Sequence, residues 1–242
     1  MAKYLSSEMH FLQVVWGRYF FMLLISLPFT FIFFRKFFVK PKNFYFQFVR
    51  SMFLFLSTVL FFYAISIVSM AKALALAFVY PMIVTLLSSF FLKEKVGLQR
   101  WLAVIIGFIG ALIIIKPGFI QINLATIAGL GTGICYAFYI ISTRKLSSID
   151  NSLLTLIFTG LFGAIIISII VPFFWITPNL NQWLLMIGLA SIGTFGHYCL
   201  ILSYNYAEAS KLSPLGYFEI VNNILIGYYF FGDFPDKWLW LG

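Results

Sequence analysis

The sequence is poor in charge, and above all in acidic residues. Only 10% of its 242 residues are charged, with 7 Asp and Glu against 16 Lys and Arg. A soluble domain carries about 25% charged residues. Because 62% of the chain is apolar and 21% aromatic, the composition excludes a water-soluble globule and a disordered chain. Lipid is the expected solvent of this protein.

Cysteine and histidine are also scarce, with two of each in the chain. Cys135 and Cys199 lie inside apolar runs, where cysteine behaves as a small buried hydrophobe. The sequence contains no His-Glu-x-x-His, no Gly-x-Ser-x-Gly and no phosphate-binding Gly-x-x-x-x-Gly-Lys-Ser/Thr. We therefore expect no metal, no cofactor, no catalytic residues and no ATP-driven step.

Long apolar runs dominate what is present. A helix that crosses a bilayer needs about 20 apolar residues, whereas the strands of a membrane barrel alternate polar and apolar residues. The runs do not alternate, so we expect an all-α polytopic membrane protein. Its eight spans are expected at 11–34, 46–68, 70–92, 98–115, 123–142, 152–174, 183–204 and 211–231, and a ninth run begins at Trp238.

The basic residues predict the orientation of these spans. If every run crosses, one side of the membrane receives most of the Lys and Arg in the loops, and that side is expected to be cytoplasmic. We expect an integral membrane protein with these basic loops in the cytoplasm, and its membrane is expected to be a bacterial plasma (inner) membrane. The basic side carries Arg35, Lys36, Lys40, Lys42, Lys93, Lys95, Arg100, Arg144, Lys145 and Lys211, whereas the other side has only Lys3, Lys116 and Lys237.

A weak internal repeat appears when the chain is aligned with itself at an offset of 139 residues. The offset pairs Lys72 with Lys211 and Glu94 with Asp233. It places spans 70–92 and 211–231 in opposite directions, which is the pattern of inverted five-helix repeats in secondary transporters. We expect a first repeat over 1–118 that lacks its first helix and a second over 123–242 whose last helix is truncated.

Several stretches resemble the drug/metabolite transporter superfamily, EamA-type. The resemblance implies a ten-helix permease built from two inverted repeats with both ends cytoplasmic. Asp233 stands where the family usually has Glu. The stretches are Arg50–Phe53, Phe62–Ala64, Ala71–Leu76, Tyr80-Pro81, Leu92–Trp101 with Gly107, Gly110 and Lys116-Pro117-Gly118, and, more loosely, Ala207–Ala209, Pro214, Phe231–Pro235 and Trp240–Gly242.

Three cations inside the apolar runs are candidate substrate ligands, because charge within lipid is costly and commonly functional. Arg18 lies about 10 Å from the end of its span at 1.5 Å per residue. A role in substrate binding or helix pairing is expected, and extension of the side chain to the headgroups, past Trp16 and Gln13, is the alternative. Arg50 and Lys72 lie nearer the ends of their spans. For both of them, extension of the side chain to the headgroups is the alternative.

Glu219 is the strongest single candidate for a functional residue, because it lies about 12 Å into its span. Asn222 and Asn223 follow at i+3 and i+4, so all three lie on one helix face. This face is predicted to line a polar cavity, where Glu219 binds a cationic group, pairs with Arg18 or takes up a proton. The alternative is a structural hydrogen-bond cluster between helices.

His197 and Tyr80 complete the set of candidates. His197 is predicted to couple transport to protons, together with Glu219; the alternative is a histidine satisfied by a neighbouring helix. Tyr80 belongs to a group of tyrosines that could line an aromatic cavity. Pro81 and Pro214 break spans 70–92 and 211–231, so the cavity is expected between these spans and spans 11–34 and 46–68.

These features together predict a secondary transporter of small metabolites that works by alternating access. Proton coupling or exchange would drive it, and an amphoteric or amino-acid-like solute would suit Arg18 and Glu219. The expected partners are this solute and the lipid bilayer, without nucleic acid, and a homodimer is compatible with the chain. The alternative is a membrane-embedded assembly factor or enzyme without transport activity.

Overall fold

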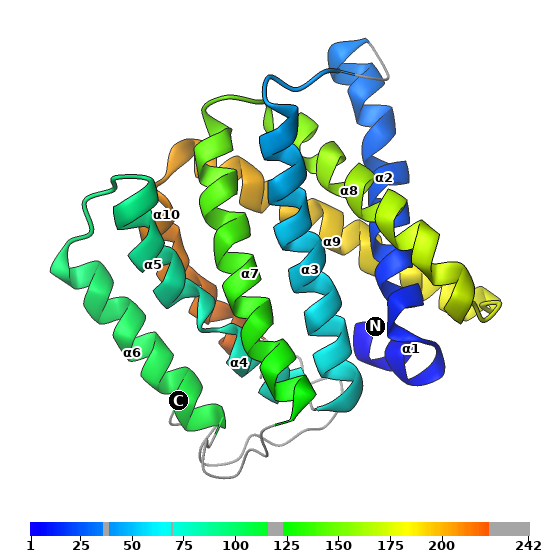
Figure 1. Ribbon diagram of the computed structural model, residues 1–242, viewed down its shortest axis with the longest axis horizontal. Helices are drawn as coiled ribbons and strands as arrows, with labels where there is room; N and C mark the ends of the chain where they lie inside the picture. The colour runs from blue at the N-terminus through cyan, green and yellow to red at the C-terminus, as the bar shows by residue number, and fades with distance from the viewer. Residues whose placement is uncertain (36–38, 69, 116–122, 223–242) are drawn as a thin grey trace.

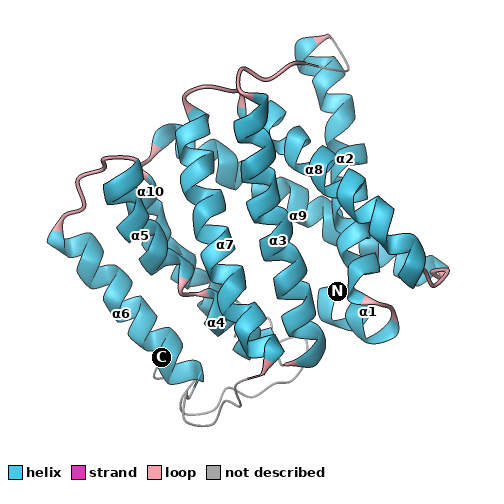
Figure 2. Ribbon diagram, in the orientation of Figure 1, coloured by secondary structure: helices cyan, strands magenta, loops and turns pink. Residues whose placement is uncertain are grey.

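The computed structural model describes residues 1–35, 39–68, 70–115 and 123–222, which are helical apart from short connections (Figures 1 and 2). The elements follow in the order α1 (Ala2–Glu8), α2 (Phe11–Phe34), α3 (Phe44–Ile67), α4 (Met70–Ala77), α5 (Tyr80–Phe91), α6 (Leu98–Ile115), α7 (Leu124–Ser147), α8 (Ser152–Ile170), the 3-10 helix η2 (Val171–Phe174), α9 (Leu180–Tyr206), α10 (Ala209–Leu212) and the 3-10 helix η3 (Ser213–Tyr217).

The expected all-helical membrane fold is confirmed. Within the described residues, six segments are long and apolar enough to cross a bilayer. They coincide with six of the eight predicted spans. The span at 98–115 is the shorter helix α6, and the span at 211–231 is described only as far as residue 222. The run that begins at Trp238 lies outside the described residues.

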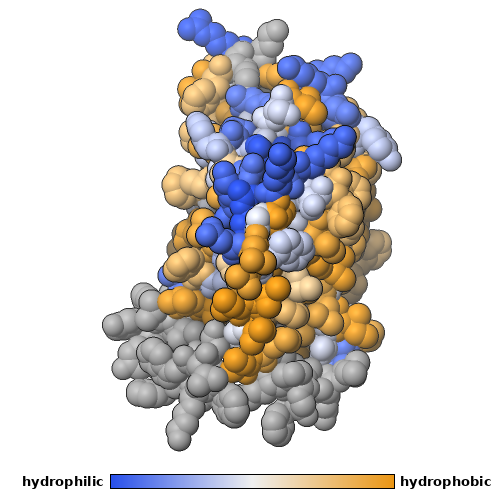
Figure 3. All heavy atoms as spheres, turned by 90° about the vertical axis from the view of Figure 1, so that its left-hand side faces the viewer, coloured by the Kyte–Doolittle hydropathy of each residue, from blue (hydrophilic) through white to orange (hydrophobic). Residues whose placement is uncertain are grey.

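The helices form a bundle in which α3 and α7 pack together in the centre, and α2 packs on α8 and α9 (Figure 1). Large apolar side chains such as Phe33, Phe90 and Ile192 remain exposed, as expected for a surface that contacts lipid. Figure 3 shows hydrophilic side chains gathered toward the upper end of one face and apolar ones below them. The α5–α6 and α7–α8 connections lie at this upper end (Figure 1), which we call the basic-loop end.

Helix α1 was not predicted, and it closes one corner of the bundle at the opposite end. The ammonium group of Lys3 donates hydrogen bonds to the carbonyl oxygens of Ile65 and Val68. These carbonyls belong to the last turn of α3 and its C-cap, where a helix leaves its oxygens without partners. Lys3 therefore satisfies the end of α3 from a segment 62 residues earlier in the chain.

Two spans are interrupted, as the prolines predict. The first breaks between α4 and α5, with Pro81 in the first turn of α5. The second passes from α10 into η3, with Pro214 in the first turn of η3. The breaks contact each other: the Tyr217 hydroxyl donates to the carbonyl oxygen of Phe78 at 3.3 Å, and the two rings lie 5.9 Å apart.

Several helix ends are separated by the offset found in the sequence. Helices α3 and α9 end at Ile67 and Tyr206, and helices α4 and α10 begin at Met70 and Ala209. Each pair differs by 139 positions, and both interrupted spans follow directly after these ends. The offset of 139 residues therefore separates corresponding helix ends in the structure as well as corresponding residues in the sequence.

Close packing beside the first break depends on glycine in α7. A Cβ atom added at Gly133 would lie 2.6 Å from Cγ1 of Val79 and against the backbone oxygen of Ala77. Ala77 is the last residue of α4, and Val79 lies between α4 and α5. Because one of the contacts is with a backbone atom, a shift that relieved it would have to move the main chain. Gly133 therefore lets α7 approach the interrupted span, as small residues do at helix contacts in membranes.

We predict that Gly133→Ala destabilises the protein by about 1–3 kcal/mol, the usual cost of overpacking. The measurement is thermal unfolding of the detergent-solubilised protein. The matched control is Gly193→Ala in α9, where an added Cβ meets nothing within 4 Å and alanine favours the helix. Equal melting temperatures for the two variants would contradict this account of the contact.

Candidate functional site

A cavity of about 190 Å³ lies at the centre of the bundle. Helices α2, α3, α4, α5, α7 and α9 contribute to its wall, together with the segment that follows η3. The wall combines apolar side chains with a few polar groups, which is the usual composition of a small-molecule site. The polar and tyrosine side chains are Arg18, Ser57, Thr58, Tyr80, Thr132, Tyr136, His197 and Glu219.

Four of the residues predicted from the sequence meet in this wall: Arg18, Tyr80, His197 and Glu219. They come from α2, α5, α9 and the segment after η3, so no single element could have brought them together. One cation, one carboxyl group and one imidazole thus share one cavity. The serine and threonine members were not singled out from the sequence, because hydroxyl side chains are common in membrane helices and gave no distinctive pattern.

A second cavity, of about 370 Å³, lies beside the first and shares Tyr80, Tyr136 and Glu219 with it. Asn222 also lines it, on the same side of its helical turn as Glu219, as the i+3 spacing predicts. Asn223 lies outside the described residues. The second cavity extends toward the basic-loop end, since residues near the end of α9, such as Ser203 and Tyr204, line it.

Tyrosine rings form the boundary between the two cavities. The rings of Tyr80 and Tyr136 meet edge to face at 4.9 Å, and the ring of Tyr136 stacks on that of Tyr139 at 5.6 Å. Edge-to-face and offset pairs are favourable arrangements of aromatic rings. The exposed faces of such rings can stack on a planar solute or attract a cationic one.

Arg18 does not extend to the membrane surface. Its Nη2 lies 2.6 Å from Nε2 of His197, across 179 residues of sequence. The Nδ1 atom of the same imidazole lies 3.5 Å from the hydroxyl oxygen of Tyr139. Arg18 is therefore held at the cavity wall by a hydrogen bond between α2 and α9.

Arg50 is fully buried and lines neither cavity. Its guanidinium group donates to hydroxyls of Thr143, Thr159 and Tyr139 at 2.8, 2.7 and 3.1 Å. It also donates to the carbonyl oxygen of Thr155 at 3.2 Å, and its Cζ lies 4.6 Å from the Tyr139 ring centroid. Arg50 thus lies between α3, α7 and α8. This position matches neither of the two expectations for Arg50, which were direct contact with the substrate and extension to the headgroups.

Lys72 is exposed on α4 and is absent from the walls of both cavities. Its role in substrate binding stays a prediction. Within the described residues, no group of three or more His, Cys, Asp or Glu side chains could hold a metal ion. Cys135 and Cys199 are both free thiols.

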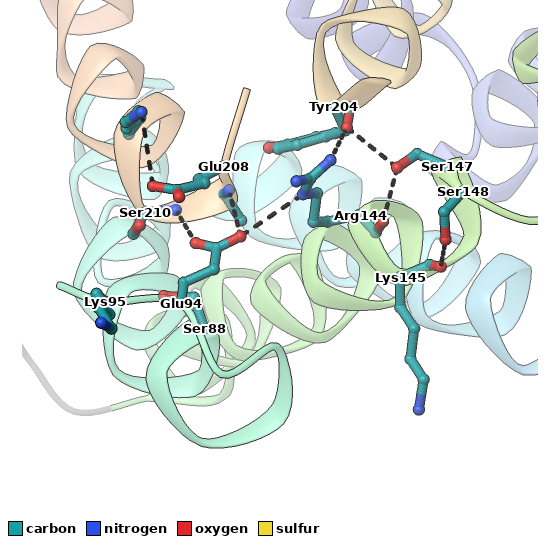
Figure 4. A network of polar contacts seen from close by, with 12 residues as sticks. Ser88, Glu94, Lys95, Arg144, Lys145, Ser147, Ser148, Tyr204, Glu208 and Ser210 are labelled. Carbon is teal, nitrogen blue, oxygen red and sulfur yellow. Dashed lines mark hydrogen bonds and ion pairs between the residues drawn. The ribbon is translucent and has the colours of Figure 1, made fainter. Parts of the chain in front are cut away.

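A polar network that the sequence did not reveal lies at the basic-loop end (Figure 4). The carboxylate of Glu94, in the α5–α6 connection, accepts hydrogen bonds from the backbone N–H groups of Ala209 and Ser210, both at 3.0 Å. Arg144 of α7 lies 3.6 Å from the same carboxylate and donates to the carbonyl oxygen of Tyr204. Glu94 thus ties one interrupted span to the start of the other.

Arg100 adds a second link at this end. Its Nη1 donates to Glu208 and to the Ser210 hydroxyl, each at 2.7 Å. The hydrogen bond from Arg100 holds the pKa of Glu208 below its usual value. Glu208 is partly exposed, so solvent screens this ion pair, and the better-buried Glu94 is the stronger link.

The family model and the similar proteins of known name are all transporters. The model of the EamA-like transporter family matches residues 1–116 and again residues 123–242. The S-adenosylmethionine uptake transporters of Rickettsia bellii and Rickettsia prowazekii are each 27% identical over 237 residues, which cover 98% of this chain and 81% and 80% of theirs.

Two further similarities concern a shorter stretch and the fold. The riboflavin transporter of Vibrio cholerae is 32% identical over 179 residues, or 71% of this chain and 58% of that protein. A solved crystal structure with 16% sequence identity superimposes with a TM-score of 0.79 and covers 99% of this chain and 85% of that one. The chain thus has the fold of that structure, and it belongs to the EamA-like transporter family of integral membrane proteins.

Proposed function

We propose that this protein is a secondary transporter that carries a small amphoteric metabolite through the two central cavities by alternating access. The main support for this proposal is that Arg18 and Glu219 line the first cavity and that Glu219 also lines the second cavity. A solute with both an anionic and a cationic group would find a partner for each. Glu219 could keep its contact while the solute passes from one cavity to the other.

The placement of the cavities supports this transport pathway. Both lie against the interrupted spans, and transporters with inverted repeats bind substrates at such discontinuous helices. The matching offset of 139 at the helix ends supports our assignment of residues 1–118 and 123–242 to two inverted repeats. The positive-inside rule assigns the basic-loop end to the cytoplasm, and the bacterial relatives support a place in a bacterial plasma membrane.

S-adenosylmethionine is the first solute to test, because several relatives are named as its uptake transporters. Its carboxylate matches Arg18, its ammonium and sulfonium groups match Glu219 and the tyrosine faces, and its adenine ring can stack on tyrosine. Riboflavin is the second solute, favoured by the flat aromatic wall and by the relative from Vibrio cholerae. It carries no ionic pair that would need Arg18 and Glu219 together.

We predict that Glu219→Gln lowers uptake of radiolabelled S-adenosylmethionine into proteoliposomes by roughly tenfold or more. The reason is that a hydrogen bond to a charged group contributes about 1.5–3 kcal/mol, and each 1.4 kcal/mol is tenfold in affinity. The control is Glu8→Gln, the same chemical change in an exposed residue that bonds Gln182 instead. Undiminished uptake by Glu219→Gln at equal insertion would refute the site.

We further propose that the network around Glu94 holds the pathway closed at the basic-loop end. It joins the α5–α6 connection, α7 and α10, and Arg144 is bonded to Tyr204 in the wall of the second cavity. For the second cavity to open to water at this end, α10 must separate from the α5–α6 connection. The hydrogen bonds of Glu94 therefore break in the open state.

We predict that Glu94→Gln makes the second cavity more accessible to water from this end. A thiol placed in the cavity wall by Ser203→Cys, with Cys135 and Cys199 replaced by serine, should react several-fold faster with a membrane-impermeant maleimide. Gln offers only one acceptor oxygen for two backbone donors, which weakens the link. Lys93→Gln, a change in the same connection outside this network, is the control, and equal rates in both variants would exclude the closing role.

A further inference from the structure

The hydrogen bond between Arg18 and His197 fixes the chemical form of the imidazole. A guanidinium group carries only donors and keeps its charge in proteins. The nitrogen that faces Arg18, Nε2 of His197 at 2.6 Å, must therefore be the acceptor and carry no hydrogen. A neutral imidazole then has its hydrogen on Nδ1, which faces the Tyr139 oxygen at 3.5 Å.

Tyr139 is held in the position that this arrangement needs. Arg50 donates to its hydroxyl oxygen at 3.1 Å and lies over its ring. The oxygen thus accepts from Arg50 on one side and can accept from Nδ1–H of His197 on the other. Because Arg50 itself is fixed by Thr143, Thr155 and Thr159, it acts as a positioning residue for the imidazole.

The charged and titratable groups around His197 come from several elements. Helix α8, which packs on α9, has no ionisable side chain over Ser152–Ile170. Among the described residues, the charged and titratable groups near His197 are Arg18 and Tyr19 of α2, Arg50 of α3, Tyr80 of α5, Tyr136 and Tyr139 of α7, and Glu219 after η3.

We propose that Arg18 couples proton binding at His197 to the binding of a carboxylate or phosphate group of the solute. A proton arriving from water and the N–H of Arg18 compete for the same lone pair on Nε2. A hydronium ion delivers this proton: its O–H bond breaks as the N–H bond forms on Nε2, water is left behind, and the hydrogen bond from Arg18 is lost. The released guanidinium group then donates to the anionic group of a solute in the cavity.

The coupling is reciprocal, as linkage requires. A solute anion that takes Arg18 away from His197 leaves Nε2 free, so binding of the anion favours binding of the proton. The two would then cross together, which gives proton-driven uptake of an anionic or amphoteric solute. This inference rests on the proposed transport function for its cargo, but its central contact can be tested without transport.

Nitrogen NMR of the histidine ring tests the contact directly. The chain has two histidines, and His10→Asn leaves His197 alone while keeping an N-cap side chain for α2. In ¹⁵N-histidine-labelled protein in lipid bilayers at pH 7.5, we expect Nδ1 to be protonated and Nε2 to be bare. A protonated Nε2, in either the other tautomer or the imidazolium, would overturn the proposal.

Two variants of Arg18 sharpen this measurement. Arg18→Lys keeps a donor-only cation beside Nε2, so the tautomer should be unchanged. Arg18→Met removes the donor, and the hydroxyl of Tyr139 can then donate to Nδ1, which should move the hydrogen to Nε2. If Arg18→Met folds and retains the original tautomer, Arg18 does not control the ring and the proposal fails; if it does not fold, the parent and Arg18→Lys still decide it.

The coupling itself is tested with two anionic probes. At the pH where half of the His197 signal is imidazolium, S-adenosylmethionine or, in a separate sample, sodium acetate should increase the imidazolium fraction, with sodium chloride at the same ionic strength as the control. An increase with acetate alone would support the coupling while removing S-adenosylmethionine as the cargo. No increase with either probe would overturn the coupling.

Discussion

Backbone groups within the hydrocarbon layer must find hydrogen-bond partners inside the protein, and this constraint governs where the chain can be interrupted. Most spans meet it as continuous helices. The two interruptions, between α4 and α5 and from α10 into η3, lie against each other and against the cavities. Phe78 at the first break is satisfied by the hydroxyl of Tyr217 beside the second. Among the described residues, these two interruptions thus lie where the proposed pathway can use them.

The membrane spans were predictable because each one is a continuous run of apolar residues long enough to cross the bilayer. The interruptions were predictable because Pro81 and Pro214 act on their own helices. The depth of Arg18 and Glu219 in lipid identified them as candidates before any contact was known. In these cases the physical cause lies within about 20 consecutive residues, which a single sequence displays in full.

The partners of these residues were not predictable, because they come from distant parts of the chain. Arg18 and Arg50 are the same residue type inside neighbouring spans, yet one faces a cavity beside His197 and the other is enclosed by hydroxyls of α7 and α8. Nothing near either arginine in the sequence separates the two outcomes. Glu94 was visible only as a repeat position, since its partners at Ala209 and Ser210 are backbone groups.

The contact between Phe78 and Tyr217 has a geometric consequence. These residues are 139 positions apart, which is the offset between the proposed repeats, so each is the counterpart of the other. If a two-fold axis relates the proposed repeats, two counterparts that touch lie on either side of it and close to it, as residues do at the centre of an isologous dimer. In an ancestor made of two identical subunits, this contact would have joined one residue to its own copy, and the present pathway would have begun as a dimer interface.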